Sequence, residues 1–584
     1  MIRKAITSLI AASVISMSAS THTSSVRLLY TTDVHGNFFP TDYISMQAAT
    51  GSMARVATAV DSIRKSEGSH NVVLLDNGDI LQGQPTVYYY NYIDTTSRHI
   101  ASEIYNFLAY DAATIGNHDI ETGHNVYDRW RAETSTPVIA ANVIDTTTGQ
   151  PYFEPYRIIN RGGMKIAVLG LITPAIPAWL PENLWEGLRF EDMASTAARW
   201  IPKIIAEESP DIIVGLFHSG HDASKKTGSY VENASVEVAR NVPGFDIVLI
   251  GHDHLKYLDS VTNIDGNKVH VINPANNAQA IGSVRITVER DSNGAILSKE
   301  ITPEIIDVSR LSPSQSFMDH FAGHRKKVLG FVSRCLGEVT DSLHSSDAFF
   351  GPSAFMTLLH DLQLEISGAD VSFAAPLSFA GVIARGPLTV SDMFTLYKYE
   401  NMLYTMELTG QEIKDYLEES YSLWTRQITD RQPHLIDFQQ TDPTPEQNRL
   451  KNPSYNFDSA AGINYTVDVT RPKGQKITIT GMSDGSPFDL SLRYKVAVNS
   501  YRGNGGGDLL TKGAGIPDSE LKSRIVGATD KDLRYYLIKA IEQRGTVTPR
   551  IDANWQFIPA DIAMPAAKTD RTLLFGPLSS KNQK

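Results

Sequence analysis

The chain has 584 residues, a length that exceeds a single hydrophobic core and predicts two or three domains. Its net charge is −12 and its isoelectric point is near 5.7, so the composition offers no basic surface for polymeric nucleic acid. Cys335 is the only cysteine, which excludes an intramolecular disulfide.

The first twenty residues, MIRKAITSLIAASVISMSAS, have the composition of a secretory signal peptide. The segment starts with basic residues, continues through an apolar middle and ends with the small residues Ser18, Ala19 and Ser20. Its apolar stretch is too short and too rich in serine for a membrane span, so no stable membrane insertion is expected. We therefore expect residues 1–20 to direct the chain to the periplasm or the medium.

Five short runs of β-branched residues and leucine predict strands that are buried on both faces. They are residues 26–30, 72–75, 165–171, 212–217 and 247–250. Helical spacing appears between them, as in residues 53–65 and 195–207. Strands that alternate with helices in this way indicate an α/β domain.

Nitrogen and oxygen donors occur where apolar runs end. The four stretches that carry them are Thr32-Asp33-Val34-His35-Gly36-Asn37, Asn77-Gly78-Asp79, Gly116-Asn117-His118-Asp119, and His218 with Gly251-His252-Asp253-His254. In open α/β sheets the ligand crevice lies outside the carboxyl ends of the strands, so these side chains should meet there. A single buried histidine is more often a core residue than a ligand. The motifs DxH, GD, GNH, HxGH and GHDH in one chain instead favour a metal site.

In these motifs the sequence resembles the binuclear metallophosphoesterases, and within them the 5′-nucleotidases and 2′,3′-cyclic-nucleotide 2′-phosphodiesterases. The resemblance implies a calcineurin-like α/β fold for residues 25–310, a two-layered β-sheet sandwich flanked by helices. It also implies two divalent metal ions, and the mixed carboxylate, amide and imidazole donors suit Mn, Zn, Co or Fe. In the family's pattern one ion is held by Asp33, His35, Asp79 and His254, and the other by Asp79, Asn117, His218 and His252.

His118 and Glu121 are the predicted catalytic pair. The resemblance gives His118 the role of a general acid or electrostatic stabiliser, oriented by an acidic residue three positions later. That residue is Glu121 here, where relatives usually have Asp or Asn. Because Glu is one methylene longer, two interpretations stay open: a partner of His118, or a solvated surface residue. Two interpretations also stay open for His221: it lines the pocket, or it lies behind the ligands or on the surface.

The second half of the chain predicts a connecting helix and a further domain. We expect residues 311–332 to form the linker helix, residues 333–562 a C-terminal domain and residues 563–584 a tail. Helical spacing occurs at residues 352–366, 410–424 and 530–544. Gly368 is a plausible stop for the first of these helices. The polar residues 426–453 predict a surface excursion.

Several motifs of this half resemble the α/β 5′-nucleotidase-type substrate domain. They occupy residues 371–376, 386–389, 396–401, 455–458, 462–465 and 499–506. In that domain two aromatic rings sandwich the nucleobase, and stacking contributes about 1–3 kcal/mol per base. By position, Tyr399 and Tyr501 are predicted to stack on the base, with Tyr455 and Phe457 as alternatives. The predicted substrate-binding residues are Tyr399, Tyr501, Arg502, Gly503, Asn504, Gly505 and Gly506.

Residues 377–385 bear on the choice of substrate. The 5′-nucleotidases carry arginines there that hold the nucleotide's phosphate, whereas Arg385 alone remains in this chain. We therefore favour a small nucleotide as the partner: a 2′,3′-cyclic nucleotide opened to a 3′-nucleotide, which then loses its phosphate. Two alternatives stay open, a 5′-nucleotidase or UDP-sugar hydrolase, and a non-catalytic nucleotide-binding surface protein. The sequence does not predict the oligomeric state.

Overall fold

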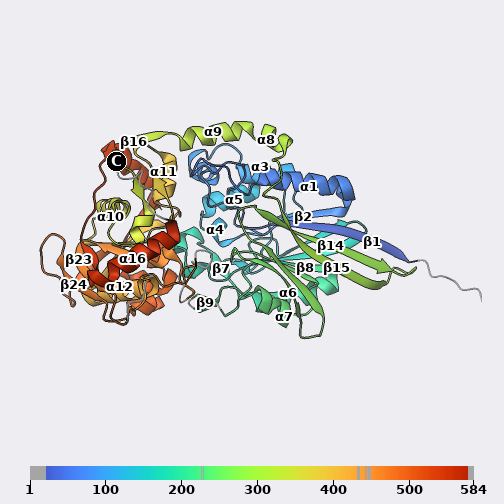
Figure 1. Cartoon of the computed structure of the whole chain (residues 1–584). Helices are drawn as coiled ribbons and strands as arrows, with labels where there is room; N and C mark the ends of the chain where they lie inside the picture. Colours follow the sequence, from blue (N-terminus) through green and yellow to red (C-terminus); the bar gives the residue numbers. More distant parts are fainter. Residues whose placement is uncertain are drawn as a thin grey trace, which may run out of the picture.

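The structure, a computed structural model, describes residues 21–576 except residues 225, 228, 430–433, 441–442 and 445–448. The predicted signal peptide lies outside the described residues. Figure 1 shows two parts side by side, one built from each half of the chain, with helices α8 (Gln315–His320) and α9 (Ala322–Val332) running between them. Within the described ranges, no helix is both long and apolar enough to cross a membrane.

Two β-sheets form the centre of the first part. One sheet has the strand order β15-β14-β1-β2-β3, and the other has the order β12-β13-β11-β8-β6-β5. The strands of the first are β1 (His22–Thr31), β2 (Val72–Asp76), β3 (Ala112–Ala113), β14 (Ala280–Arg290) and β15 (Ile296–Asp307). Those of the second are β5 (Tyr156–Arg161), β6 (Met164–Ile172), β8 (Ile212–His218), β11 (Ile247–Ile250), β12 (Lys256–Thr262) and β13 (Lys268–Pro274). All five predicted strands lie in these sheets.

The two sheets pack face to face through apolar side chains. Leu28 of β1 belongs to the same buried cluster as Leu216 of β8, whereas the adjacent Leu29 packs with the helices on the outer face. Successive residues of a strand point to opposite faces, so burial on both faces explains the unbroken hydrophobic runs. The covering helices are α1 (Met53–Glu67), α3 (Ile100–Leu108) and α5 (His124–Glu133) on one side, and α6 (Met193–Glu208) and α7 (Ser235–Asn241) on the other. The predicted sandwich of sheets flanked by helices is confirmed.

A five-stranded sheet of order β22-β18-β25-β21-β26 forms the centre of the second part. Its strands are β18 (Val371–Ala374), β21 (Met402–Thr409), β22 (Ser459–Ala461), β25 (Arg493–Asn499) and β26 (Ile525–Asp532). Helices α10 (Ala354–Ser367) and α15 (Leu533–Arg544) pack on one face, and α12 (Gly410–Trp424) packs on the other. This part is also an α/β domain, as predicted.

Shorter elements complete both parts. In the first they are α2 (Pro85–Tyr88), α4 (Asn117–Ile120), β4 (Val143–Asp145), β7 (Leu188–Phe190), β9 (Lys226–Thr227) and β10 (Tyr230–Val231). In the second they are β16 (Cys335–Val339), β17 (Leu343–His344), β19 (Val382–Ile383), β20 (Gly386–Thr389), α11 (Val390–Leu396), β23 (Ile463–Asp468), β24 (Ile477–Met482), α13 (Ser500–Gly503), α14 (Asp518–Arg524), β27 (Thr546–Val547), β28 (Trp555–Ile558) and α16 (Ala560–Phe575).

Helix α12 begins and ends where the sequence predicts, because its capping residues are local. Thr409 and Glu412 form a capping box, in which the Thr409 N–H donates to Glu412 Oε2 at 2.7 Å and the Glu412 N–H to Thr409 Oγ1 at 3.1 Å. The predicted helix at residues 530–544 is shorter. Its first residues belong to strand β26, and Asp532 caps α15 by accepting the Tyr535 N–H at 3.2 Å.

The connecting helix was predicted as one element and is two. The backbone leaves the helical conformation at Phe321, whose φ is −93° and ψ is 14°. The Phe321 ring is fully buried and packs 4.6 Å from the Phe317 ring. The helix thus breaks between α8 and α9 at a residue whose aromatic side chain is packed in the core. The sequence pattern does not predict this break.

The predicted tail at residues 563–584 is wrong for its described portion, because α16 extends to Phe575. The carboxylate of Asp570 is fully buried, accepts the Leu435 and Ile436 N–H groups at 2.7 Å each and contacts His434 Nδ1 at 2.5 Å. The same contacts correct the interpretation of residues 426–453 as a surface excursion, since Leu435 and Ile436 are buried.

Candidate active site

The predicted metal ligands meet at one edge of the two packed sheets. They are Asp33 and His35 after β1, Asp79 after β2, Asn117 at the start of α4, His218 at the end of β8, and His252 and His254 after β11. Because the strands run parallel in the centre of each sheet, their carboxyl ends place donors from both sheets at the same edge.

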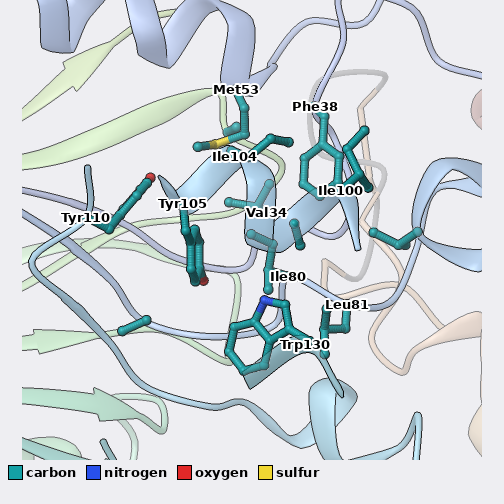
Figure 2. Packing of buried hydrophobic residues seen from close by; sticks show 14 of the residues in the cluster. Val34, Phe38, Met53, Ile80, Leu81, Ile100, Ile104, Tyr105, Tyr110 and Trp130 are labelled. Carbon is teal, nitrogen blue, oxygen red and sulfur yellow. The ribbon is translucent and has the colours of Figure 1, made fainter. Parts of the chain in front are cut away.

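Apolar residues beside the ligands anchor these loops in the core. Figure 2 shows Val34, Ile80 and Leu81 within a packed cluster that also contains Trp130. Val34 lies between Asp33 and His35 in the chain, and Ile80 and Leu81 follow Asp79 directly. All three apolar side chains are fully buried. Rigid packing of the neighbours therefore fixes where the polar side chains point.

Five of the ligands adopt left-handed backbone conformations, which non-glycine residues rarely do. Their φ angles are 49° at Asp33, 48° at His35, 58° at Asp79, 72° at His252 and 58° at His254. Each such residue costs of order 1–3 kcal/mol, and clustering of this strain is characteristic of functional sites. The surrounding fold thus stabilises loops that are unfavourable in isolation.

A first group of donors contains Asp33, His35, Asp79 and His254, whose ligand atoms all lie within 4.8 Å of one another. His35 Nε2 lies 3.0 Å from His254 Nε2, and His254 Nε2 lies 3.4 Å from Asp33 Oδ1. Imidazole nitrogens that approach one another beside two carboxylates form a site with the donors of a divalent cation. These residues fit a metal ion.

A second group contains Asn117, His218 and His252. Asn117 Oδ1 lies 3.2 Å from His218 Nε2 and 2.8 Å from His252 Nδ1. Asp79 connects this group to the first, because its Oδ2 lies 3.2 Å from His218 Nε2 and 3.9 Å from His35 Nε2. That oxygen is buried and accepts no hydrogen bond of ordinary geometry from the described residues. A buried carboxylate oxygen without a proton donor is suited to a cation.

The rear nitrogens of three histidines are held by protein oxygens. His35 Nδ1 lies 3.2 Å from the Gln82 carbonyl, and His218 Nδ1 lies 2.6 Å from the Asn77 carbonyl. His252 Nε2 lies 3.1 Å from Glu232 Oε1. Donation from the rear nitrogen leaves the lone pair of the other nitrogen facing the site. No sequence motif pointed to Glu232.

Asp119 is a structural residue of the site that the sequence analysis did not single out, although it stands in the motif with Asn117. Its Oδ2 accepts the N–H groups of Asp79 and Gly116 at 2.8 Å each, and its Oδ1 accepts those of Ile80 and Leu81 at 2.9 and 2.8 Å. Gly116 allows the close approach of the two loops, because a Cβ there would lie 2.0 Å from Asp79 Oδ1. Asp119 therefore ties the loop of Asp79 to the loop of Asn117.

We expect Asp119→Ala to lower the free energy of unfolding by about 3–5 kcal/mol, because four buried N–H groups lose their acceptor. Denaturation in urea measures the change. Asp119→Asn is the matched control: it keeps the shape and one acceptor oxygen, so its loss should be smaller. An unchanged midpoint for Asp119→Ala would contradict the role of this carboxylate.

His118 is paired with Glu121, which settles the geometry that the sequence left open. His118 Nδ1 lies 2.6 Å from Glu121 Oε2, and Glu121 is 7% exposed rather than solvated. Burial alone would lower the pKa of His118, but the negative charges of Asp79 and Glu121 outweigh it and raise the pKa to about 9. His118 therefore lies beside the predicted metal ligands as a partly exposed imidazole that favours its charged form.

His221 contacts a different partner. Its Nδ1 lies 2.6 Å from Asp253 Oδ2, and its ring stacks on Tyr257 with centroids 4.9 Å apart. Asp253 Oδ1 in turn accepts from Asn273 Nδ2 at 2.8 Å. His221 therefore joins the loop after β8 to the loop after β11.

Tyr399 and Tyr501 are both partly exposed. Burial raises the pKa of Tyr399 to about 12, and the nearby Tyr455 and Glu121 add to the effect. Burial also raises the pKa of Tyr501, with Tyr455 and Glu232 among the contributors. The Tyr455 ring lies edge-on to Tyr501 with centroids 6.4 Å apart.

Phe457 is unsuited to the sandwich. It is fully buried and stacks on Trp424 with centroids 5.4 Å apart.

The turn after Tyr501 connects the two parts of the chain. Asn504 Nδ2 donates to the Trp179 carbonyl at 3.2 Å, and the Trp179 ring lies 5.6 Å from the ring of the predicted ligand His252. The absence of a side chain at Gly506 allows the Tyr501 ring to pack closely on the backbone, because a Cβ there would lie 2.5 Å from the ring. The turn therefore places Tyr501 close to the metal-ligand groups.

Arg502 was predicted to bind substrate, and its contacts correct that prediction. All five of its N–H donors are taken by protein oxygens. They bond to both carboxylate oxygens of Asp458, to Asn456 Oδ1 and to the carbonyls of Gly506 and Tyr455. The guanidinium is 2% exposed and holds the loops of Tyr455 and Tyr501 together. Distant partners such as Asp458 could not be read from the local sequence.

Two family models match the chain: calcineurin-like phosphoesterase over residues 26–256 and the 5′-nucleotidase C-terminal domain over residues 332–512. The chain is 26% identical to the 2′,3′-cyclic-nucleotide 2′-phosphodiesterase/3′-nucleotidase of Yersinia enterocolitica, over 97% of this chain and 93% of that protein. It is 28% identical to the trifunctional nucleotide phosphoesterase YfkN of Bacillus subtilis over 91% of this chain. The chain spans 39% of that longer relative.

Solved structures share the whole arrangement. A candidate 5′-nucleotidase of Staphylococcus aureus, in complex with α-ketoglutarate, has a TM-score of 0.75 at 23% identity and covers 91% of this chain and 100% of that chain. The 5′-nucleotidase precursor of Thermus thermophilus has a TM-score of 0.62 at 20% identity, with 92% and 99% covered. At these identities the likeness shows the fold alone.

The fold and the donor set define a metallophosphoesterase, a class whose domain implies divalent metal ions. More narrowly, the chain joins a calcineurin-like phosphoesterase domain, matched over residues 26–256, to a 5′-nucleotidase C-terminal domain, matched over residues 332–512. Both the resemblance and the fold expected from the motifs are confirmed.

Proposed function

We propose that the protein is an exported hydrolase that opens 2′,3′-cyclic nucleotides to 3′-nucleotides and then removes the 3′-phosphate. The observation that carries the proposal is the position of Asp79, whose Oδ2 lies 3.9 Å from His35 Nε2 in one group of donors and 3.2 Å from His218 Nε2 in the other. Such a carboxylate suits a site shared by two cations. The names of the Yersinia enterocolitica relative and its Salmonella typhimurium counterpart, 27% identical over 94% of this chain, support the choice of substrate.

Two divalent ions, Mn, Zn, Co or Fe, suit the donor types. The proposed ligands are Asp33, His35, Asp79 and His254 for one ion, and Asp79, Asn117, His218 and His252 for the other. When bound, such a pair lowers the pKa of a water and stabilises charge on the attacking and leaving oxygens.

His118 acts on the phosphoester. Its Nδ1 is occupied by Glu121, and its side chain is 28% exposed, so the remaining Nε2 is the atom available to a substrate. Because the neighbouring carboxylates favour the charged imidazole, His118 donates a hydrogen bond or a proton to the oxygen that leaves.

The tyrosines hold the base while the phosphoester lies at the metal-ligand groups. A cyclic phosphodiester carries one negative charge and lies against the ribose, so it needs fewer cationic side chains than a 5′-phosphate. Arg385, the one arginine within residues 377–385, is consistent with that smaller need.

Export rests on the composition of residues 1–20, which has the features of a signal peptide. A phosphoesterase in the periplasm or the medium would release nucleosides from nucleotides outside the cytoplasm. N-terminal sequencing of the mature protein from the producing cell tests this: the proposal requires a start shortly after residue 20.

We expect Tyr399→Ala and Tyr501→Ala each to raise KM for nucleotides by the equivalent of about 1–3 kcal/mol, because a base loses one stacking face. Tyr399→Phe and Tyr501→Phe are the controls, since they keep the ring. Hydrolysis of bis(p-nitrophenyl) phosphate, which has no base, should change far less. Equal damage to both substrates would make the tyrosines structural.

Assays of 2′,3′-cyclic AMP, 3′-AMP, 5′-AMP and UDP-glucose with Mn, Co or Zn test the proposed function. The proposal requires kcat/KM for the first two to be well above that for the last two. Preference for 5′-AMP or UDP-glucose would instead identify a 5′-nucleotidase or UDP-sugar hydrolase with the same metal site. Absence of turnover with every metal and substrate would favour a non-catalytic binding protein.

A further inference from the structure

A loop of the C-terminal domain, residues 397–401, contacts the catalytic domain beside His118. The loop connects α11 to β21. Its Asn401 donates from Nδ2 to Glu121 Oε1 at 3.4 Å, and its Glu400 accepts from the Tyr92 hydroxyl at 3.3 Å. Asn401 is 8% exposed and Glu400 is 6% exposed, so both contacts are shielded from water.

The loop is held firmly on its own domain by Arg534. The Arg534 Nε donates to the Tyr397 carbonyl at 3.1 Å, and its Nη2 donates to the Lys398 carbonyl at 2.6 Å. The guanidinium is fully buried and lies 3.9 Å from the centroid of the Phe394 ring. These contacts fix the loop to the domain that carries it.

The chemistry of the neighbours fixes which way the Asn401 amide points. Its Oδ1 accepts from the Tyr397 hydroxyl at 3.2 Å. A carboxylate can only accept hydrogen bonds, so the atom that faces Glu121 must be the amide nitrogen. The other oxygen of Glu121 faces His118 Nδ1 at 2.6 Å. A continuous chain of hydrogen bonds thus runs from Tyr397 through Asn401 and Glu121 to His118.

We propose that Asn401 is a positioning residue that holds the Glu121 carboxylate in line with His118 and makes the catalytic pair depend on the C-terminal domain. The inference rests on the proposed function. A glutamate has one more rotatable bond than the aspartate or asparagine of relatives, and a hydrogen bond to its far oxygen restricts that bond. The same loop carries Tyr399, so a base bound on Tyr399 and the orientation of His118 are linked through one rigid segment.

We expect Asn401→Ala to lower kcat for 2′,3′-cyclic AMP by about 3- to 10-fold, as for loss of one hydrogen bond, with KM nearly unchanged. Asn401→Asp should lose more, because it sets a second carboxylate against Glu121. Tyr92→Phe is the matched control: it removes the neighbouring interdomain bond to Glu400 and should change kcat by less than about twofold. Metal content and the unfolding midpoint of each variant are measured alongside.

A double variant separates positioning from structural damage. In a Glu121→Ala background, Asn401→Ala should cause no further loss of kcat, because its partner is already absent. Three results would overturn the inference. They are a kcat of Asn401→Ala equal to that of the wild-type protein, a loss of kcat in Tyr92→Phe as large as that in Asn401→Ala, or a loss in the Glu121→Ala/Asn401→Ala double variant equal to the product of the two single losses. The same variants are compared on bis(p-nitrophenyl) phosphate. If the wild-type protein hydrolyses this ester but no cyclic nucleotide, the proposed substrate is wrong. The kcat of the variants on the ester then still tests the role of Asn401.

Discussion

We expect Asp79→Asn to lower kcat/KM by about 10³-fold or more, together with loss of at least one metal ion from the purified protein. The substitution removes the charge from the oxygen that borders both groups of donors. Asn also places an amide where two cations would share a carboxylate. Metal analysis of the purified variant beside kinetics with 2′,3′-cyclic AMP measures both effects.

The matched control for this variant is Asp570→Asn. Asp570 is also a fully buried carboxylate, but it lies in the C-terminal domain against His434. It should affect stability and leave the metal content unchanged. Normal metal content and near-normal turnover in Asp79→Asn would remove the bridging assignment.

We expect His118→Ala to lower kcat by about 10²–10⁴-fold while the metal content stays normal. His118 contacts Glu121 through Nδ1, so the loss comes from the group that faces the substrate and not from a metal ligand. Glu121→Gln should lose less, because the imidazole remains but its charged form is less favoured.

Loss of metal in His118→Ala would instead make the histidine a ligand. An unchanged rate in Glu121→Gln would show that Glu121 does not assist His118. The proposed role of Asn401 would then also be wrong.

That the predicted metal ligands would lie together could be anticipated from the sequence, because each lies next to a feature of the local sequence. A run of four apolar residues ends at Leu75, and Asp79 lies four residues after that end. His218 directly follows another apolar run. Parallel strands then bring such positions together whatever the intervening chain does. The sheets were predictable for the same reason, since strands buried on both faces leave a continuous apolar pattern.

Residues whose roles depend on distant partners could not be predicted in this way. Arg502 was predicted to bind substrate, but its charge is neutralised by Asp458, 44 residues away. Glu121 has a second partner, Asn401, 280 residues later in the chain, which no local pattern reveals. Helix α16 was taken for a tail because part of its burial comes from Asp570, a charged residue that apolar patterns ignore.

The most direct test of the account is the identity of the first product formed from 2′,3′-cyclic AMP by the metal-loaded protein. Chromatography at early times, before the second hydrolysis proceeds, should show 3′-AMP accumulating first and adenosine appearing later. Replacing the cyclic substrate with 3′-AMP should yield adenosine directly. Accumulation of 2′-AMP, or no hydrolysis of the cyclic ester by protein that cleaves 5′-AMP, would contradict the proposed reaction.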